Sequence, residues 1–240
     1  MEMLLFSAAA GVGGMFLGGI ISALLSRKSS EKAMSGLLAF AAGVMISIVC
    51  FKLIGEFFED YTLPVIFGVI SGIIAMMILN GIAEKIMSKS NKNHNNLLRS
   101  GTFMLIAMAL HNIPEGMAIG AGGSYDFRLG VVLTIIMALH TIPEGMAVVT
   151  PLMVGGAKKG IAILLVSLAG STMFLGGVLG VLAGGISDAA IAVSLAAAGG
   201  AMIYIVFAEL IPHSISMGKG KTAPILIMIG ILVGLIAAAF

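Results

Sequence analysis

The chain has 240 residues, of which 59% are hydrophobic and 10% are charged, and its formal net charge is +2. A soluble domain carries about 25% charged residues, so this chain has too few polar side chains to cover a water-facing surface. The composition excludes a soluble globular protein and indicates an integral membrane protein in a lipid bilayer, for which we expect no nucleic-acid partner.

Apolar stretches long enough to cross a bilayer follow one another along the chain. A transmembrane helix needs about 20 such residues. We expect eight spans, near residues 3–25, 34–58, 62–84, 101–123, 129–153, 160–184, 188–213 and 222–240. The first is long enough to span, and Arg27 and Lys28 follow it rather than precede it, so we interpret it as a retained helix and not a signal peptide. The prediction is an all-α integral membrane fold with one transmembrane domain, residues 1–240.

Basic residues gather in alternate loops. The loops after the odd-numbered spans contain Arg27, Lys28, Lys32, Lys85, Lys89, Lys92, Arg99, Lys158, Lys159, Lys219 and Lys221. The acidic residues of the opposite side are Glu2, Glu59, Asp60, Asp126 and Asp188. Because positive loops stay in the cytoplasm, the pattern predicts a multi-pass protein of the cell membrane with both termini outside.

Two internal repeats are visible. MALHNIPEGMA at 108–118 and MALHTIPEGMA at 137–147 differ at one position, and AGVMISIVCFKLIGE at 42–56 resembles GGAMIYIVFAELIPH at 199–213. The members of each pair fall in spans that run in opposite directions. We therefore predict an inverted repeat of spans 1–3 and 6–8 around a central hairpin of spans 4 and 5.

The first repeat carries two His/Glu pairs. His111 and Glu115 are four residues apart, as are His140 and Glu144, so each pair lies on one helix face. Imidazole nitrogen together with carboxylate oxygen suits zinc, iron, manganese, cobalt or cadmium better than copper(I) or magnesium. An ionisable residue at mid-bilayer costs about 2.5–3.5 kcal/mol, which favours function over packing. The pairs predict a divalent-metal site between spans 4 and 5.

Other polar residues accompany these pairs. Asn112 and Thr141 follow the histidines and offer oxygen atoms to a second ion or a water molecule. Pro114 and Pro143 each remove a backbone hydrogen bond, so we expect a kink in both helices.

Glu209, in the seventh span, has two interpretations. It could neutralise Lys52, its partner in the second repeat, as a buried ion pair. Alternatively it lies on an ion pathway, as intramembrane carboxylates often do. Glu56 and Glu59 end the second span, where they act either as solvated helix-end residues or as an outer funnel for cations.

The doubled motif resembles the signature of the ZIP (Zrt/Irt-like) family of divalent-metal transporters, prokaryotic type. HNIPEG at 111–116 and HTIPEG at 140–145 match its fourth and fifth spans, and AAGVM at 41–45 and ELIP at 209–212 match its second and seventh. The resemblance implies a transporter and not an enzyme, which moves a divalent cation into the cytoplasm. Zn²⁺ is the first candidate, carried as substrate with no prosthetic group.

The resemblance also implies roles for individual residues. The metal positions that it indicates are His111, Asn112, Glu115, His140, Glu144 and Glu209. The two His/Glu pairs would form the primary site, Asn112 would belong to an adjoining one, and Glu209 to the cytoplasmic path. Met173 and Phe174 stand where many relatives have Glu-Pro, so we expect one four-ligand site rather than two.

Two alternatives stay open from the sequence. A membrane metalloenzyme could use the same ligands, although no HExxH motif occurs and the chain has only four histidines. A metal sensor that does not transport is the other. Small-residue helix faces also allow a homodimer.

Overall fold

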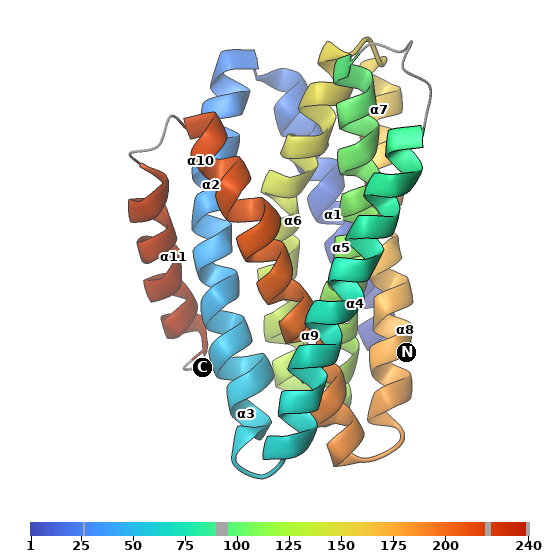
Figure 1. Ribbon diagram of the computed structural model, residues 1–240, viewed down its shortest axis with the longest axis vertical. Coiled ribbons are helices and arrows are strands. Elements are labelled where there is room, and N and C mark those ends of the chain that lie inside the picture. The colour runs from blue at the N-terminus through green and yellow to red at the C-terminus, as the bar shows by residue number, and fades with distance from the viewer. Residues whose placement is uncertain (26, 90–95, 219–221, 239–240) are drawn as a thin grey trace.

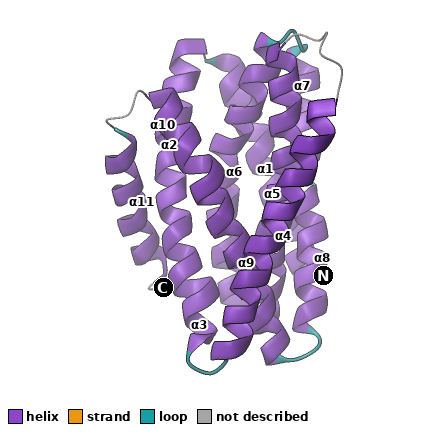
Figure 2. Ribbon diagram, in the orientation of Figure 1, coloured by secondary structure: helices purple, strands orange, loops and turns teal. Residues whose placement is uncertain are grey.

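The computed structural model describes residues 1–25, 27–89, 96–218 and 222–238 (Figure 1). Within these ranges every regular element is a helix and no strand occurs, as Figure 2 shows. This confirms the expected all-α fold. His94, which the sequence places in the longest polar connection, lies outside the described residues.

The helices follow one another with short connections. Their bounds are α1 Glu2–Leu24, α2 Arg27–Ile48, η1 Val49–Ile54, α3 Gly55–Phe58, α4 Thr62–Lys89, α5 Asn96–Tyr125, α6 Phe127–Val154, α7 Lys159–Gly170, α8 Thr172–Gly184, α9 Asp188–Ile205, η2 Val206–Leu210, α10 Ile211–Gly218 and α11 Ala223–Ala238.

Seven helical segments of the described chain are long and apolar enough to cross a membrane. They are Glu2–Leu24, Met34–Phe58, Thr62–Lys85, Gly101–Tyr125, Phe127–Val154, Lys159–Gly184 and Asp188–Met217. An eighth apolar helix, Ala223–Ala238, is shorter. Large apolar side chains such as Leu5, Phe67, Leu168 and Leu232 are more than half exposed, as expected of helices whose outer faces contact lipid.

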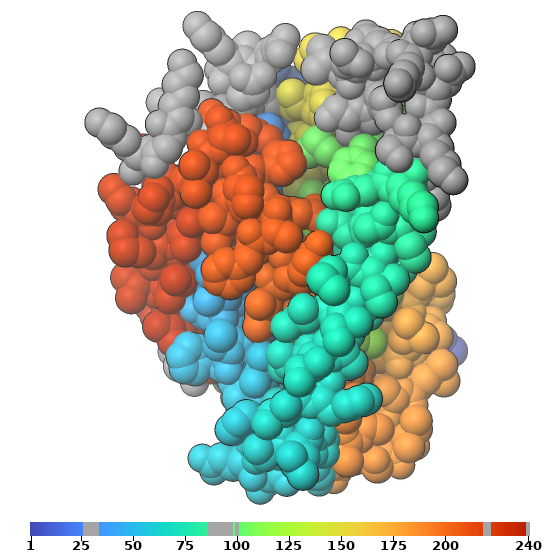
Figure 3. Space-filling view, in the orientation of Figure 1, coloured from blue at the N-terminus to red at the C-terminus, as the bar shows by residue number. Residues whose placement is uncertain are grey.

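The bundle consists of two groups of helices. In one group α1, α5, α6, α7 and α8 pack against one another, and in the other α4 packs along α9 and α11 along α2. Figures 1 and 3 show α4 crossing diagonally in front of α9. The groups meet where α5 contacts α9 and α6 contacts α2. The helices α5 and α6 therefore lie where the two groups join.

Glycine permits the closest helix contacts. Gly116 of α5 lies against the carbonyl oxygen of Met173 in α8, and Gly176 of α8 lies against that of Ile113 in α5. A Cβ atom at either position would collide with backbone. Small residues at helix crossings are the usual means of packing helices in a membrane.

The irregular helix segments lie outside the two helices that contain Pro114 and Pro143. α5 and α6 continue as α-helices through Pro114 and Pro143. Instead, two π-helical segments, η1 and η2, interrupt the second and seventh spans, and a turn at Ser171 separates α7 from α8. Because π-helical turns are rare and often occur at functional sites, η1 and η2 are candidates for a role near the centre of the bundle.

Candidate metal centre

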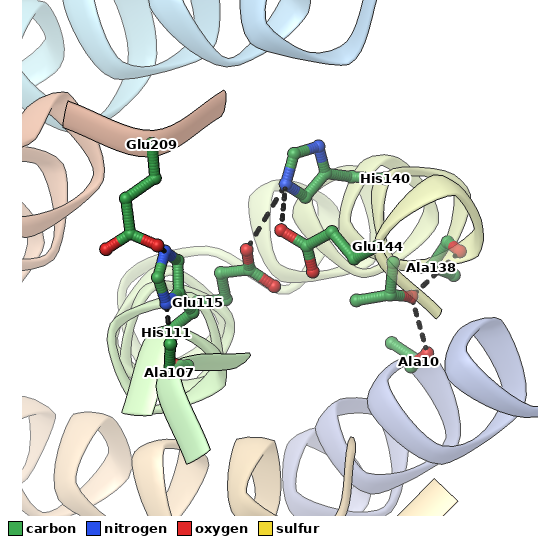
Figure 4. Close-up of polar contacts among 9 residues, drawn as sticks. Ala10, Ala107, His111, Glu115, Ala138, His140, Glu144 and Glu209 are labelled. Atoms are coloured by element: carbon green, nitrogen blue, oxygen red, sulfur yellow. Dashed lines mark hydrogen bonds and ion pairs between the residues drawn. The ribbon is translucent and has the colours of Figure 1, made fainter. Parts of the chain in front are cut away.

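Four titratable side chains meet at the centre of the bundle, two from each central helix. His111 and Glu115 come from α5, and His140 and Glu144 come from α6. All four residues are at most 4% exposed. Their four-residue spacing puts each pair on one helix face, and the packing of α5 against α6 turns Glu115 toward His140, as Figure 4 shows.

Three of the four form a compact group. Glu115, His140 and Glu144 each offer one ligand atom, and these atoms all lie within 4.8 Å of one another. His140 Nε2 lies 2.9 Å from Glu144 Oε1 and 3.5 Å from Glu115 Oε1. Apart from these contacts with His140, the carboxylate oxygens of the two glutamates have no hydrogen-bond partner in the described part of the chain.

A bound cation would satisfy that electrostatic arrangement. Buried polar atoms are normally hydrogen-bonded, and a buried charge is normally paired or bound to a metal. Here two buried carboxylates share a single imidazole. A divalent cation between them would meet two oxygen ligands and one nitrogen ligand, a donor set that suits zinc and similar metals.

His111 faces a different partner from the other three. Its Nδ1 lies 2.6 Å from the carbonyl oxygen of Ala107, so a neutral imidazole that donates there keeps a lone pair on Nε2. Nε2 lies 3.3 Å from Glu209 Oε2 (Figure 4). Asn80 Nδ2 donates a hydrogen bond of 3.0 Å to the other oxygen of Glu209. A second cluster, His111, Glu209 and Asn80, thus adjoins the first.

Sequence reasoning missed Asn80. The residue is 8% exposed and lies in α4, within the third apolar span. A lone amide in an otherwise apolar span is a signal that could have identified it, since polar groups inside a membrane usually face a partner.

The ion pair considered between Lys52 and Glu209 is absent. Lys52 Nζ lies 3.9 Å from Glu56 Oε2, one helical turn further along, while Glu209 contacts His111 and Asn80. That interpretation of Glu209 was wrong. Glu56 is an exposed residue near the end of the second span, and Lys52 is its ion-pair partner.

The polar residues beside the histidines connect helices. Asn112 Nδ2 donates to the carbonyl oxygen of Ala169 at 3.1 Å, whereas its Oδ1 has no hydrogen-bond partner among the described residues. Thr141 Oγ1 lies 3.2 Å from the carbonyl oxygen of Ala10 and 3.1 Å from that of Ala138. Asn112 therefore keeps an oxygen available to an ion, and the Thr141 hydroxyl is engaged in packing.

Two cavities lie on opposite sides of this centre. One of about 110 Å³ is lined by residues that include Ala107, Glu209 and His213, toward the α10 end of the bundle. The other, of about 440 Å³, is lined by residues that include Lys52 and Val132, at the α3 end.

Only the cavity at the α10 end reaches a residue of the two clusters. Buried Leu133 and Met137 lie on α6 between Val132 and His140. Val132 precedes His140 by eight residues, about 12 Å along a helix. Of these two cavities, the one at the α10 end therefore comes nearer to the clusters, through Glu209, while apolar residues of α6 lie between the other one and His140.

The fold and this buried group define a multi-pass membrane protein built around a cation site. A family model described as "ZIP Zinc transporter" matches residues 80–240, two thirds of the chain. The chain belongs to the ZIP family. Since this is a family of transporters, the protein is not an enzyme.

Individual relatives agree with this assignment. The zinc transporter ZupT of Shigella dysenteriae is 33% identical over 210 residues, which cover 83% of this chain and 80% of the relative. The ZupT of Corynebacterium efficiens is 30% identical over 239 residues, with 90% and 86% covered. The zinc transporter GufA of Myxococcus xanthus is 37% identical over 138 residues, with 57% and 54% covered.

Proposed function

We propose that this protein carries divalent metal ions across the membrane into the cytoplasm, with Zn²⁺ as the main substrate. The observation that carries the proposal is the buried group of Glu115, His140 and Glu144, whose ligand atoms lie within 4.8 Å of one another in a chain of the ZIP family. Curated relatives are named zinc transporters. Iron, manganese, cobalt and cadmium accept the same donor types.

The residues of the proposed site have different roles. Glu115 and Glu144 offset the cost of removing water from the ion, and His140 supplies the nitrogen that favours zinc over magnesium. The ion then passes to His111 and Glu209, which lie toward the cavity at the α10 end.

One ion at a time is the expected occupancy. Asn112 Oδ1 offers a single oxygen beside the primary site, but the buried side chain that α8 contributes near this level is Met173, a thioether. A second divalent cation there would lack a carboxylate of its own, and hard or borderline cations bind thioethers weakly.

The proposed direction follows from the distribution of charge. Described basic residues lie at the end of α4, as Lys85 does, and where α7 begins, as Lys158 and Lys159 do. The acidic residues Glu59 and Asp126 lie in the connections after α3 and α5. By the positive-inside rule the α10 end is cytoplasmic and the α3 end external. We therefore propose that both termini are outside the cytoplasm and that the membrane is the cell membrane.

We also propose that spans 1–3 and 6–8 are an inverted repeat within a single transmembrane domain, residues 1–240. Equivalent contacts support this on the periphery. α4 packs along α9 as α11 packs along α2. Gly72 of α4 lies against the carbonyl oxygen of Ala197 in α9, and Gly230 of α11 lies against that of Phe40 in α2. The two contacts are equivalent under the proposed repeat, in which α4 corresponds to α11 and α9 to α2.

Contacts at the centre support the same relation. Asn112 of α5 donates to Ala169 in α7, and Thr141, its equivalent in α6, donates to Ala10 in α1. The two π-helices support it as well, because η1 and η2 occupy corresponding positions of the second sequence repeat. Inverted repeats that enclose a midplane site are typical of secondary transporters.

A homodimer stays a prediction. The small-residue faces that suggest it are largely used inside the chain, since Gly18 packs against Ile142 and Gly72 against Ala197. Gly81 of α4 is an exception, because a Cβ there would meet no atom within 4 Å. Light scattering of the purified protein in detergent would measure the oligomeric state.

Uptake of Zn²⁺ into proteoliposomes tests the proposed function. Purified wild-type protein should take up Zn²⁺, and Glu115→Gln and Glu144→Gln should reduce uptake to nearly that of protein-free vesicles, because each removes a charge from the primary site. Asp188→Asn is the matched control, since Asp188 is exposed. Zinc binding in detergent without flux would instead indicate a sensor, and full activity of both glutamine variants would contradict the assigned site.

A further inference from the structure

Lys52 and Glu209 occupy corresponding positions with opposite charge. Each is the fourth residue of a π-helix, η1 or η2, in the second sequence repeat. The relation that pairs η1 with η2 also pairs His111 with His140 in the first repeat. Glu209 on one half therefore relates to His111 as Lys52 on the other half relates to His140.

Only one of these two contacts exists in the structure. Glu209 Oε2 lies 3.3 Å from His111 Nε2. Lys52 Nζ instead lies 3.9 Å from Glu56 Oε2 and lines the cavity at the α3 end. The contact of α4 with α9 in one half corresponds to the contact of α11 with α2 in the other. The two halves therefore share these helix contacts but differ in the partners of Lys52 and Glu209.

The difference agrees with the side on which a cavity adjoins one of the clusters. The cavity beside Glu209 adjoins the His111 cluster, while Leu133 and Met137 separate the cavity beside Lys52 from His140. Two halves with the same fold can exchange these conformations, and the exchange opens the site toward the other side of the membrane.

We infer that, when the site faces the α3 end, Lys52 leaves Glu56 and lies beside His140, where its ammonium group replaces the metal ion in the empty carrier. The inference rests on the proposed transport function and on the inverted repeat. It makes Lys52 a counter-charge for the return of the empty carrier, a positioning role distinct from metal binding.

The charges at the centre explain why such a group is useful. Without an ion, the carboxylates of Glu115 and Glu144 share only His140. Burying carboxylates without a full set of partners is costly, and the cost opposes reorientation of the empty site. The ammonium of Lys52 supplies positive charge from within the chain, so that no second ion is needed.

A bound metal ion has the opposite effect on Lys52. A divalent cation at His140 repels the ammonium strongly where the dielectric constant is low. Glu56 then provides the alternative partner, as it does in this structure. The metal ion and the Lys52 ammonium thus cannot lie beside His140 at the same time. The site reorients with either the ion or the ammonium in that position.

Two flux assays on proteoliposomes separate this role from metal binding. Net uptake of Zn²⁺ into zinc-free vesicles requires the empty carrier to return, whereas exchange of labelled Zn²⁺ for internal Zn²⁺ does not. We expect Lys52→Met to reduce net uptake several-fold and to leave exchange close to wild type. Lys52→Arg keeps the charge and should restore net uptake.

Lys158→Met is the matched control, since Lys158 is an exposed lysine in the connection before α7, and it should alter neither flux. Net uptake by Lys52→Met equal to wild type would overturn the inference. An equal loss of net uptake and exchange would also overturn it, because it would indicate a role in metal access or folding. If wild-type protein shows neither flux, the proposed function fails and the inference fails with it.

Discussion

At the scale of single residues, two nearly identical motifs produce different surroundings. His140 contacts both Glu115 and Glu144, whereas His111 contacts Ala107 and Glu209. The difference arises outside the motifs, because η2 brings a carboxylate to one histidine and η1 brings no acid to the other. Glu115, His140 and Glu144 consequently form the primary group. The second cluster, His111, Glu209 and Asn80, adjoins it on the side of the cavity at the α10 end.

The nitrogen ligand of the primary group should control which metal is carried. His140→Asp replaces an imidazole by a third carboxylate, and all-oxygen sites suit harder cations such as manganese. We expect Zn²⁺ uptake to fall relative to Mn²⁺ uptake, measured by competition between the two ions in proteoliposomes. Ser216→Asp, at an exposed position of α10, is the comparison variant. An unchanged ratio for His140→Asp would argue against His140 as a ligand.

Asn80 should matter through Glu209. Asn80→Ala removes the amide that donates to Glu209 Oε1, and a hydrogen bond to a charged group contributes about 1.5–3 kcal/mol. We expect Zn²⁺ uptake to fall several-fold while Zn²⁺ affinity at the primary group, measured by calorimetry in detergent, stays close to wild type. Ser71→Ala is the control, since Ser71 donates only to Gly68 of its own helix α4. Wild-type uptake by Asn80→Ala would refute the coupling.

At the scale of helices, glycine decides how closely neighbours approach. Gly11 and Gly170 lie against each other's backbone where α1 crosses α7, and Gly116 lies against Met173 where α5 crosses α8. These contacts hold α5 and α6 inside the bundle and so determine where their ligands meet. Without a hydrophobic driving force between helices in lipid, close packing of this kind is a main source of stability.

Two glycines of α1 test this directly. A Cβ at Gly18 would collide with the carbonyl oxygen of Ile142, whereas one at Gly13 would meet no atom within 4 Å. Overpacking costs about 1–3 kcal/mol, while alanine in place of an unhindered helical glycine stabilises by about 0.5–1 kcal/mol. Gly18→Ala should therefore lower the thermal midpoint in detergent, and Gly13→Ala should keep or raise it. Equal thermal midpoints for the two variants would show that α1 and α6 can move apart at Gly18 without loss of stability.

At the scale of the whole molecule, the bundle combines two groups of helices around one polar centre. The group of α2, α4, α9 and α11 contributes Asn80 and Glu209, and the group that contains α5 and α6 contributes both His/Glu pairs. A movement of one group against the other would change the contact between His111 and Glu209 while leaving the primary group intact. The path of the ion therefore depends on the relation between the groups.

The proposed orientation can be measured with cysteine labels. In a Cys50→Ser background, a membrane-impermeant thiol reagent should label Ile186→Cys in intact cells but not Lys158→Cys. Both positions are exposed, and they lie in connections at opposite ends of the bundle, after α8 and after α6. Lysed cells provide the control in which both should react. The reverse pattern in intact cells would invert the proposed orientation and the direction of uptake.

The sequence by itself determined the class of protein and the local geometry. Composition and apolar run length are enough to predict membrane helices, since a bilayer imposes a fixed thickness on each span. The four-residue spacing is enough to put each histidine beside its glutamate on one helix face. The doubled motif is specific enough to indicate the family, which the comparisons confirm.

Only the tertiary structure decided which of these groups face one another. Asn80, His111 and Glu209 come from α4, α5 and η2, and no spacing within one helix determines contacts among three. Two spans are interrupted by π-helical turns, and sequence repeats alone do not reveal the backbone state of Val49–Ile54 or Val206–Leu210. Spacing along a chain determines only the relations within a helix, whereas relations between helices depend on how their surfaces pack.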